Sequence, residues 1–315
     1  MKILYIDSGN VIDNSYIYRY YGDLYRELEK ICDITVYQKP IKNINPVAVS
    51  EKFDCVIFGL GYFARGDINT FAKIPGLEHV KIPTVCLIHK PQHLLTEKLQ
   101  FCKINNIDLL VDSQSTFKKH GEISCCESLR IWFSASPEYF YPRDVVKKYD
   151  IGFIGAMHGN NKINGPTANL RDRIYNLIID SNHDIYWNGQ LSPSDRIASI
   201  EEYASVINKS KIWISTTGPT IDVSPRYFEV LLSKTLLFCN NEPEQYGEVF
   251  KDGINCIMYQ NDLSNFEEKL KYYLQNEKER KKIIETAYEE AISKYTTKHM
   301  AIKLLNKIKE IKNVI

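Results

Sequence analysis

The residues best suited to chemistry lie in one stretch of the second half of the chain, residues 215–232. A predicted strand ends there in a loop rich in hydroxyl groups and glycine, which includes Thr217 and Gly218. Ser224 and Pro225 then have the residue types that begin a helix, as N-cap and as first helical residue. A helix N-terminus offers unpaired amides and the positive end of a dipole, which favour a phosphate group.

The helix predicted to begin there carries two further polar groups. Arg226 supplies a guanidinium whose fork of donors suits a diphosphate. Glu229 lies one turn later, and its carboxylate can accept two hydrogen bonds, as the vicinal hydroxyls of a ribose would donate. Together these residues predict a nucleotide diphosphate site. An ordinary capped helix with one salt bridge explains the same residues equally well.

A second glycine pattern, residues 59–64 (GLGYFA), follows a predicted strand and matches the Gly-x-Gly-x-x-Ala pattern of dinucleotide-binding proteins. That pattern normally follows the first strand of its fold. Here the first strand ends instead in Ser8-Gly9-Asn10. We therefore interpret residues 59–64 as a glycine turn and keep an NAD-dependent or epimerase-type enzyme as an alternative.

Several enzyme classes are excluded because their motifs are missing. The sequence has no P-loop, no His-Glu-x-x-His and no Gly-x-Ser-x-Gly, which excludes P-loop ATPases, zinc peptidases of that type and α/β-hydrolases. It has no Asp-x-Asp, the carboxylate pair that holds Mg²⁺ or Mn²⁺ in metal-dependent nucleotide-sugar enzymes, so we expect no metal. The net charge of +1 gives no indication of a nucleic-acid partner.

The elements that would position these residues follow a βαβ pattern. Short apolar runs alternate with amphipathic helical stretches from residue 2 onward, and the pattern restarts at residues 150–155. This predicts an α/β protein with two Rossmann-like halves and a boundary near residues 141–148. No apolar run reaches the about 18 residues of a membrane span, so we expect a cytoplasmic protein.

The last helix predicted by the sequence, residues 298–315, has apolar residues on one face and lysines on the other. We interpret it as a helix packed on the protein itself. Weak peripheral contact with an anionic membrane surface is the alternative, because a basic amphipathic helix can lie on such a surface.

Residues 226–233 (RYFEVLLS) resemble the R-x-F-E-A-L-A-x-G helix of group 1 (family 4-like) glycosyltransferases, closest to the spore-maturation-protein branch. Residues 249–253 resemble the F-x-D-G turn of that branch, and residues 132–142 resemble its linker between domains. Residues 150–155 resemble the strand that opens its second domain, and residues 82–89 a strand of its first. The resemblance covers most of the chain.

This resemblance implies a GT-B fold, in which two Rossmann-like domains with parallel sheets face each other across a cleft. The acceptor-side domain would comprise residues 1–143 and the nucleotide-sugar-binding domain residues 144–297, with the helix 298–315 crossing back to the first domain. A UDP- or GDP-sugar would be the donor, held without a metal or another cofactor. The acceptor would be a hydroxyl group on a carbohydrate, a lipid-linked molecule or a protein.

The resemblance also implies roles for single residues. His89 would lie near the donor sugar and Arg226 would stabilise the leaving diphosphate, so these two are the catalytic candidates. Either Arg171 or Arg173 would be a second phosphate contact, and the sequence leaves both open. The residues expected to bind the donor are Gly9, Gly155, Arg171, Arg173, Thr217, Gly218, Ser224, Arg226, Tyr227 and Glu229.

Two positions depart from the family pattern. Ile221 stands where the broader family has the first Glu of E-x7-E, and Lys234 replaces the usual glycine after the helix. The resemblance implies a monomeric or homodimeric enzyme that retains anomeric configuration and acts in surface glycan or glycoconjugate synthesis. The departures motivate a third interpretation, a non-catalytic carbohydrate-binding or structural protein.

Overall fold

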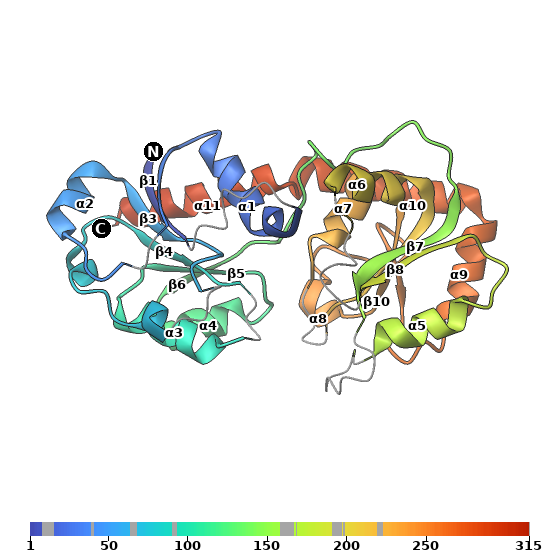
Figure 1. The fold of residues 1–315 in the computed structure, drawn as a ribbon, viewed down its shortest axis with the longest axis horizontal. Helices are drawn as coiled ribbons and strands as arrows, with labels where there is room; N and C mark the ends of the chain where they lie inside the picture. The colour runs from blue at the N-terminus through green and yellow to red at the C-terminus, as the bar shows by residue number, and fades with distance from the viewer. Residues whose placement is uncertain are drawn as a thin grey trace. The chain divides into compact units, whose positions relative to one another are not determined.

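The structure is a computed structural model that describes residues 1–7, 16–38, 41–63, 68–89, 93–157, 167, 169–190, 197, 199–218 and 223–314, with the backbone alone for residues 16–22 and 190. The chain divides into two compact units (Figure 1). Unit 1 comprises Met1–Trp132 and Thr297–Ile315, and unit 2 comprises Phe133–Thr296. Each unit holds one parallel sheet with helices packed on it, which confirms the predicted α/β class.

Unit 1 has a six-stranded sheet with the order β2-β1-β3-β4-β5-β6, in which all neighbours are parallel. The central strands are short and fully buried, as expected of parallel strands covered on both faces. The elements of unit 1 are β1 (Lys2–Ile6), α1 (Tyr16–Glu29), β2 (Asp33–Tyr37), α2 (Pro46–Lys52), β3 (Cys55–Phe58), the 3-10 helices η1 (Ile68–Phe71) and η2 (Leu77–His79), β4 (Thr84–Leu87), α3 (Leu95–Ile104), β5 (Leu109–Asp112), α4 (Phe117–Ser124), β6 (Glu127–Arg130) and α11 (Thr297–Lys312).

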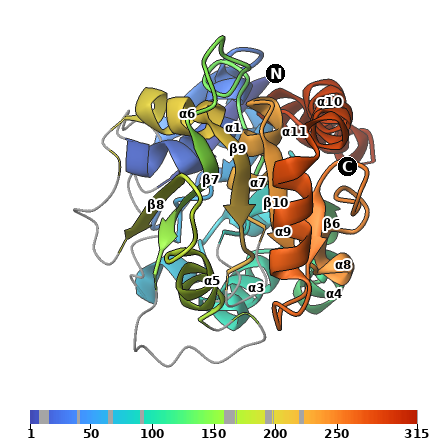
Figure 2. The ribbon, with the colours of Figure 1, turned by 90° about the vertical axis from the view of Figure 1, so that its right-hand side faces the viewer.

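Unit 2 has a five-stranded parallel sheet with the order β11-β10-β9-β7-β8. Figure 2 shows β8, β7, β9 and β10 next to one another, and α9 packs against β11. The elements of unit 2 are β7 (Tyr149–Ala156), α5 (Leu170–Ile178), β8 (Ile185–Gln190), α6 (Ile200–Lys209), β9 (Ser210–Ser215), α7 (Arg226–Leu232), β10 (Leu236–Asn240), α8 (Pro243–Tyr246), β11 (Ile257–Tyr259), α9 (Phe266–Gln275) and α10 (Glu277–Lys294).

The segment before β7 packs within unit 2. The Arg143 amide donates to Asn208 Oδ1 at 2.8 Å, and Asn208 Nδ2 donates to the carbonyl of Tyr141 at 3.2 Å. The ring of Phe140 meets the ring of Tyr203 edge-on at a centroid distance of 5.7 Å. These contacts explain why unit 2 begins at Phe133, ahead of the boundary that the sequence suggested near residue 143.

Helix α11 closes unit 1, because its apolar face is buried and it packs against α1 (Figure 1, red). The Trp132 amide contacts Met300 Sδ at 3.4 Å. On the polar face, Lys307 Nζ lies 2.5 Å from Glu127 Oε2 and Lys312 Nζ lies 2.5 Å from Asp54 Oδ1. The apolar face that a lipid surface would need is therefore occupied, in agreement with a helix packed on the protein itself.

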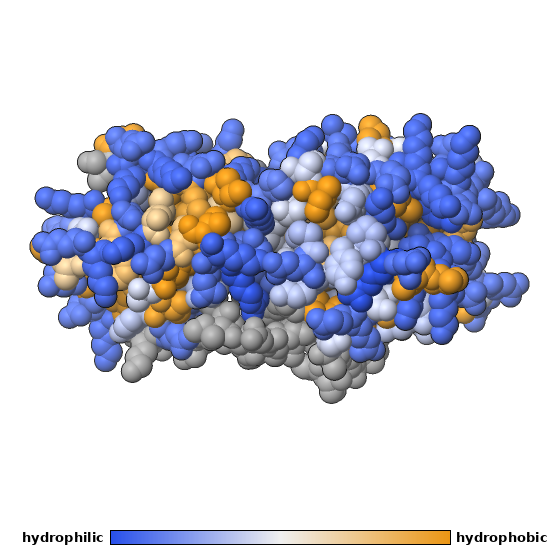
Figure 3. All heavy atoms as spheres, turned by 90° about the horizontal axis from the view of Figure 1, so that it is seen from above, coloured by the Kyte–Doolittle hydropathy of each residue, from blue (hydrophilic) through white to orange (hydrophobic). Residues whose placement is uncertain are grey.

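Among the helices of the described residues, none is both long and apolar enough to cross a membrane. Figure 3 shows hydrophilic side chains predominating on the face drawn, with hydrophobic ones in smaller groups between them.

We expect the docking of α11 to contribute measurably to stability. Leu304 is fully buried in this helix, so Leu304→Ala should lower the free energy of unfolding by about 2–5 kcal/mol, through lost burial and the cavity left behind. Ile302, two residues away, is 39% exposed, and Ile302→Ala should change stability by less than about 1 kcal/mol. Urea unfolding of the two variants measures the difference, and equal losses would contradict this packing of the helix.

Candidate active site

The carboxyl ends of β7 and β9 define the candidate site in unit 2. The chain runs from β7 to β8 on one side and then returns to place β9 on the other side of β7. In open α/β sheets, ligands bind at the carboxyl edge where the strand order reverses in this way. Gly155 and Ala156 end β7 at this point, and Thr216 directly follows β9.

Arg171 joins the two strands at this reversal. Its Nε donates to Thr216 Oγ1 at 2.7 Å and its Nη1 donates to the Ala156 carbonyl at 2.7 Å. Both acceptors are uncharged, so these hydrogen bonds fix the guanidinium without neutralising its charge. Burial lowers the pKa of Arg171, and the nearby charge of Arg226 lowers it further. The guanidinium still remains charged near neutral pH.

Arg226 approaches the same point from the first turn of α7. A Cβ built on Gly155 would lie 3.4 Å from Arg171 Nη1 and 3.5 Å from Arg226 Nη1. One nitrogen of each guanidinium therefore lies within 3.5 Å of one position above Gly155. A side chain at residue 155 would occupy that position and would also crowd the Phe153 ring at 2.9 Å. Two converging guanidinium groups repel each other, and an anion between them would relieve that repulsion.

Arg173 lies two residues after Arg171 but serves another contact. Its Nη1 donates to the carbonyl of Asn261 at 3.0 Å and its Nη2 to the carbonyl of Asp262 at 2.9 Å. It thus holds the loop after β11. The structure brings Arg171, not Arg173, to Arg226 and Gly155.

The loop after β9 is fixed by Asn240, a fully buried residue that ends β10. Asn240 Oδ1 accepts the amide of Thr217 at 2.8 Å, and Asn240 Nδ2 donates to Thr217 Oγ1 at 2.9 Å. Asn240 Nδ2 also donates to Asn261 Oδ1 at 3.0 Å, and Thr167 Oγ1 donates to the Gly218 carbonyl at 2.8 Å. Thr217 and Gly218 are therefore held in place by neighbouring elements. Sequence reasoning missed Asn240, although a polar residue that ends an apolar strand was a usable signal.

Helix α7 begins one residue later than the sequence suggested. Pro225 occupies the N-cap position and Arg226 is the first helical residue. The side chain of Ser224 does not cap the helix. The carbonyl of Ser224 accepts the amide of Tyr227 at 3.2 Å, and the carbonyl of Pro225 accepts the amides of Phe228 and Glu229. The Ser224 hydroxyl is buried and finds no hydrogen-bond partner among the described residues. Tyr227 is fully buried and its hydroxyl lies 3.3 Å from Asn240 Oδ1, so it supports the loop from below.

Glu229 is half-buried and is oriented by Tyr203 of α6, whose hydroxyl donates to Glu229 Oε2 at 2.6 Å. The same hydroxyl accepts from Arg226 Nε at 3.3 Å. Tyr203 thus links the two charged residues of α7 that the sequence singled out. It is a second residue that sequence reasoning missed, and no local signal near α7 pointed to a tyrosine on another helix.

Comparison with known protein families bears on this arrangement. Residues 161–306, which include Arg171, Thr217, Arg226 and Glu229, match the family described as glycosyl transferase-like. This segment is thus similar in sequence to that family. No curated protein matches the chain closely enough to count as a relative. The match does not single out the spore-maturation-protein branch.

Solved structures with the same fold support this similarity. The chain is similar to Anabaena HepE in complex with UDP-glucose, with 11% identity, full coverage of both chains and a TM-score of 0.57. It is also similar to an alpha-glucosyltransferase in complex with UDP-glucose and DNA containing an abasic site, with 10% identity, 98% and 99% coverage and a TM-score of 0.61. Sucrose-phosphate synthase from Thermosynechococcus elongatus gives 10% identity, full coverage of both chains and a TM-score of 0.61. The GT-B fold expected from the sequence is confirmed.

The glycine pattern of unit 1 has a structural reason that disfavours a dinucleotide. The strand order of unit 1 reverses between β1 and β3, where Gly61 donates its amide to Asp7 Oδ2 at 3.0 Å. A Cβ on Gly59 would lie 2.3 Å from Asp7 Oδ2, and one on Gly61 would lie 2.3 Å from Asp7 Oδ1. The glycines make room for a carboxylate, and a pyrophosphate would be repelled there.

The remaining sequence candidates lie elsewhere. His89 is buried just after β4 in unit 1, where its carbonyl accepts Lys98 Nζ at 2.7 Å. Gly9 and Ile221 lie outside the described residues. In the described part of the chain, no group of three or more His, Cys, Asp or Glu residues is arranged to hold a metal ion.

We expect the hydrogen bond from Tyr203 to Glu229 to contribute measurably to the free energy of unfolding. Tyr203→Phe keeps the ring and removes the hydroxyl that donates to a half-buried carboxylate, so we expect a loss of about 1–3 kcal/mol in the free energy of unfolding. Tyr272→Phe removes a hydroxyl from a side chain that is 48% exposed and should change stability by less than about 0.5 kcal/mol. Chemical denaturation compares the two, and a Tyr203→Phe protein as stable as wild type would show that the contact contributes nothing.

Proposed function

We propose that this protein transfers a sugar from a UDP-sugar to a hydroxyl acceptor and holds the donor in unit 2 without a metal. The observation that carries the proposal is the convergence of Arg171 and Arg226 at the reversal of strand order beside Gly155. A nucleotide diphosphate carries negative charge that would offset the repulsion between the two guanidinium groups. The UDP-glucose complexes of two proteins with this fold support UDP-glucose as the first donor to test.

The chemistry follows from the charge on the leaving group. Breaking the bond between the anomeric carbon and the diphosphate leaves negative charge on the nucleotide. Arg171 and Arg226 are already fixed where that charge develops, so they would stabilise the transition state with little reorganisation. Removing one such donor typically costs about 2.7–4 kcal/mol of transition-state stabilisation. Arg226 is therefore the proposed catalytic residue of unit 2.

Glu229 would bind the ribose of the donor. Tyr203 occupies one carboxylate oxygen at 2.6 Å and fixes the orientation of the group. A carboxylate has about four lone-pair sites, so it can accept further hydrogen bonds from vicinal hydroxyls. Thr217 and Gly218, held by Asn240 and Thr167, would line the donor beside the two arginines. Retention of configuration remains the expectation from the family resemblance.

The donor site can be tested by thermal shift with UDP. A ligand that binds only the native state at about 100 times its Kd stabilises it by about 2.7 kcal/mol, so UDP should raise the Tm of the wild type. Arg171→Gln and Arg226→Gln should each weaken UDP binding at least about tenfold, because each removes a charge-assisted hydrogen bond. Arg173→Gln is the matched control and should keep the shift, since Arg173 holds the loop after β11. Equal losses in all three variants would contradict the assignment.

The role of Glu229 can be tested by turnover. Glu229→Gln should lower kcat/KM for UDP release from UDP-glucose by about tenfold or more, since a neutral amide accepts ribose hydroxyls less strongly. Glu268→Gln, an exposed position on α9, should leave kcat/KM unchanged. UDP release is followed by chromatography. Tight UDP binding with no release from any UDP- or GDP-sugar, even with acceptor mixtures, would favour a non-catalytic carbohydrate-binding protein.

A further inference from the structure

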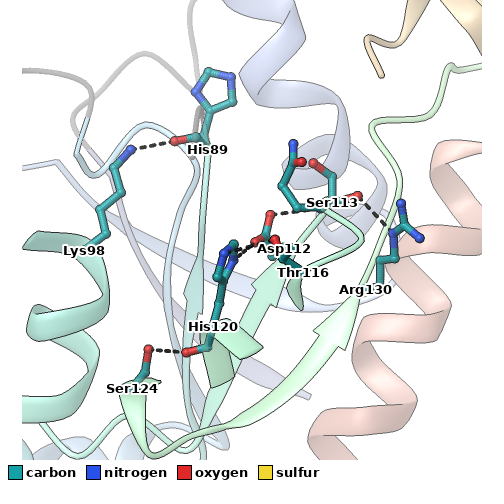
Figure 4. A network of polar contacts seen from close by, with 9 residues as sticks. His89, Lys98, Asp112, Ser113, Thr116, His120, Ser124 and Arg130 are labelled. Atoms are coloured by element: carbon teal, nitrogen blue, oxygen red, sulfur yellow. Dashed lines mark hydrogen bonds and ion pairs between the residues drawn. The ribbon is translucent and has the colours of Figure 1, made fainter. Parts of the chain in front are cut away.

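Three polar side chains of unit 1 form a hydrogen-bonded set at the carboxyl end of β5, and we call it the β5 triad: Asp112, His120 and Thr116 (Figure 4). His120 Nδ1 lies 2.6 Å from Asp112 Oδ2, and His120 Nε2 lies 3.0 Å from Thr116 Oγ1. A hydroxyl, a base within hydrogen-bond reach and a carboxylate that orients the base form the arrangement that activates nucleophiles in enzymes. All three residues belong to unit 1, whereas the proposed donor site lies in unit 2.

The hydrogen-bond partners assign the direction of each bond in the triad. Asp112 Oδ1 accepts the amide of Gln114 at 3.1 Å, and Asp112 Oδ2 accepts Nδ1–H of His120. In this tautomer the lone pair of the neutral imidazole is on Nε2. The Thr116 hydroxyl therefore donates to Nε2, which increases the negative charge on Oγ1 and makes it a better nucleophile.

The burial of the triad increases from the hydroxyl to the carboxylate. Thr116 is exposed, the His120 side chain is 9% exposed and the Asp112 side chain is completely buried. A substrate in solvent can therefore reach Oγ1, while the base is held behind it. Ser124 Oγ donates to the carbonyl of His120 at 2.7 Å and helps to fix the backbone of α4 at this position.

Thr116 does not serve as a helix cap. It occupies the N-cap position of α4, where a threonine oxygen normally accepts an amide of the first turn, but its side chain makes no capping hydrogen bond. The first amides of a helix have no acceptor within the helix, so they can stabilise a negatively charged oxygen. Such an oxygen develops next to Thr116 when its hydroxyl attacks a carbonyl group.

The cations drawn near the triad in Figure 4 donate to backbone carbonyls. Arg130 Nε donates to the Ser113 carbonyl at 3.0 Å, and Lys98 Nζ donates to the His89 carbonyl at 2.7 Å. The ring of His89 points away from the triad (Figure 4). Among the described residues, Asp112 is thus the charged group in direct contact with the imidazole of His120.

We propose that the β5 triad is an additional active site, which hydrolyses short acyl esters with Thr116 as the nucleophile. This activity is separate from sugar transfer and uses residues of unit 1 alone. Thr116 Oγ1 bonds to the carbonyl carbon of the ester, and its proton moves to His120 Nε2. The bond from that carbon to the alcohol oxygen then breaks, and the alcohol leaves with the proton from His120.

Water completes the reaction. Its oxygen bonds to the carbonyl carbon of the acyl group on Thr116 and its proton moves to His120. The bond to Thr116 Oγ1 then breaks, Thr116 regains a proton from His120 and the carboxylic acid leaves. One ester and one water thus give one acid and one alcohol. Thr116 and His120 are the catalytic residues, and Asp112 is a positioning residue because it acts through His120.

The surroundings of Thr116 favour a small acyl group. Ser115, Lys118 and Lys119 are exposed next to it in the sequence, so a long alkyl chain would meet polar side chains and solvent there. The carboxyl edge of a parallel sheet is also where ligands of open α/β sheets bind. An acetyl ester is therefore the first substrate to test.

A covalent probe tests the nucleophile directly. Diisopropyl fluorophosphate reacts with activated hydroxyl groups, because the oxygen bonds to phosphorus, fluoride leaves and the neighbouring base takes the proton. Peptide mass spectrometry should find the adduct on Thr116 of the wild type and none at this position in Thr116→Val. Thr116→Ser should restore labelling, and Ser115→Ala, the neighbouring exposed hydroxyl, should label like the wild type. A wild-type protein without an adduct on Thr116 would overturn the proposal.

Turnover of p-nitrophenyl acetate gives a second readout. Thr116→Val should keep the wild-type Tm, since the position is exposed, and should lower kcat/KM by about 100-fold or more, the usual contribution of acid–base catalysis. Asp112→Asn should lower kcat and leave KM unchanged, because Asp112 does not touch the substrate. An unchanged kcat/KM in Thr116→Val refutes the triad.

The two proposals of this protein's activity fail separately. A wild-type Tm that UDP does not change refutes the donor site of unit 2 and leaves the labelling of Thr116 as expected. An unlabelled Thr116 together with a normal rise of Tm with UDP refutes the β5 triad alone.

Discussion

The hydrogen bonds of Arg171 to Ala156 and Thr216 are the constraint on which the proposed donor site depends. They tie together the ends of β7 and β9, the two strands between which the order of the sheet reverses. Because both acceptors are neutral, the arginine is held firmly while its charge stays available. Desolvation and the charge of Arg226 make that arrangement costly in the free protein. A bound diphosphate would reduce the repulsion between the two arginines. The repulsion that destabilises the free protein would therefore favour binding of an anionic ligand.

The two units share the reversal of strand order in a parallel sheet but carry different residues at it. In each parallel sheet the strand order reverses beside the first strand of the unit, β1 or β7. The residues that follow the strands at this reversal differ between the two units. In unit 2 the chain supplies arginines around Gly155, whereas in unit 1 it supplies Asp7 against Gly59 and Gly61. An anionic donor is thereby favoured at one reversal and disfavoured at the other. Glycines stand at both places: at Gly59 and Gly61 they make room for the Asp7 side chain, and at Gly155 a Cβ would approach Phe153 and the two arginines.

The sequence predicted the α/β class, the restart of the pattern at β7 and most of the residues around Gly155, because apolar runs and strand-to-glycine turns are local signals. It did not separate Arg171 from Arg173. Residues two apart on a helix point about 200° away from each other, and which face looks at the sheet depends on tertiary packing. It also suggested Ser224 as the cap of α7, since residue preference alone does not fix the first helical residue within a position.

The residues that sequence reasoning missed share a physical cause. Tyr203 and Asn240 contact partners from other elements, and these contacts exist only once the chain has folded. Such residues are ordinary in the sequence and distinctive in the structure.

The proposed donor chemistry makes one demand on its surroundings. It has to stabilise negative charge that appears on a leaving group, and fixed guanidinium groups on a rigid sheet edge would serve this without moving a proton. Arg171 bonds neutral oxygens at the ends of two strands of unit 2, so its position is fixed while its positive charge is kept. The hydroxyl of Tyr203 holds both Arg226 and Glu229, so the second guanidinium is oriented from a helix outside α7. A group that is oriented before the ligand arrives loses little freedom when the charge develops, and this favours a site built on a sheet edge and two packed helices.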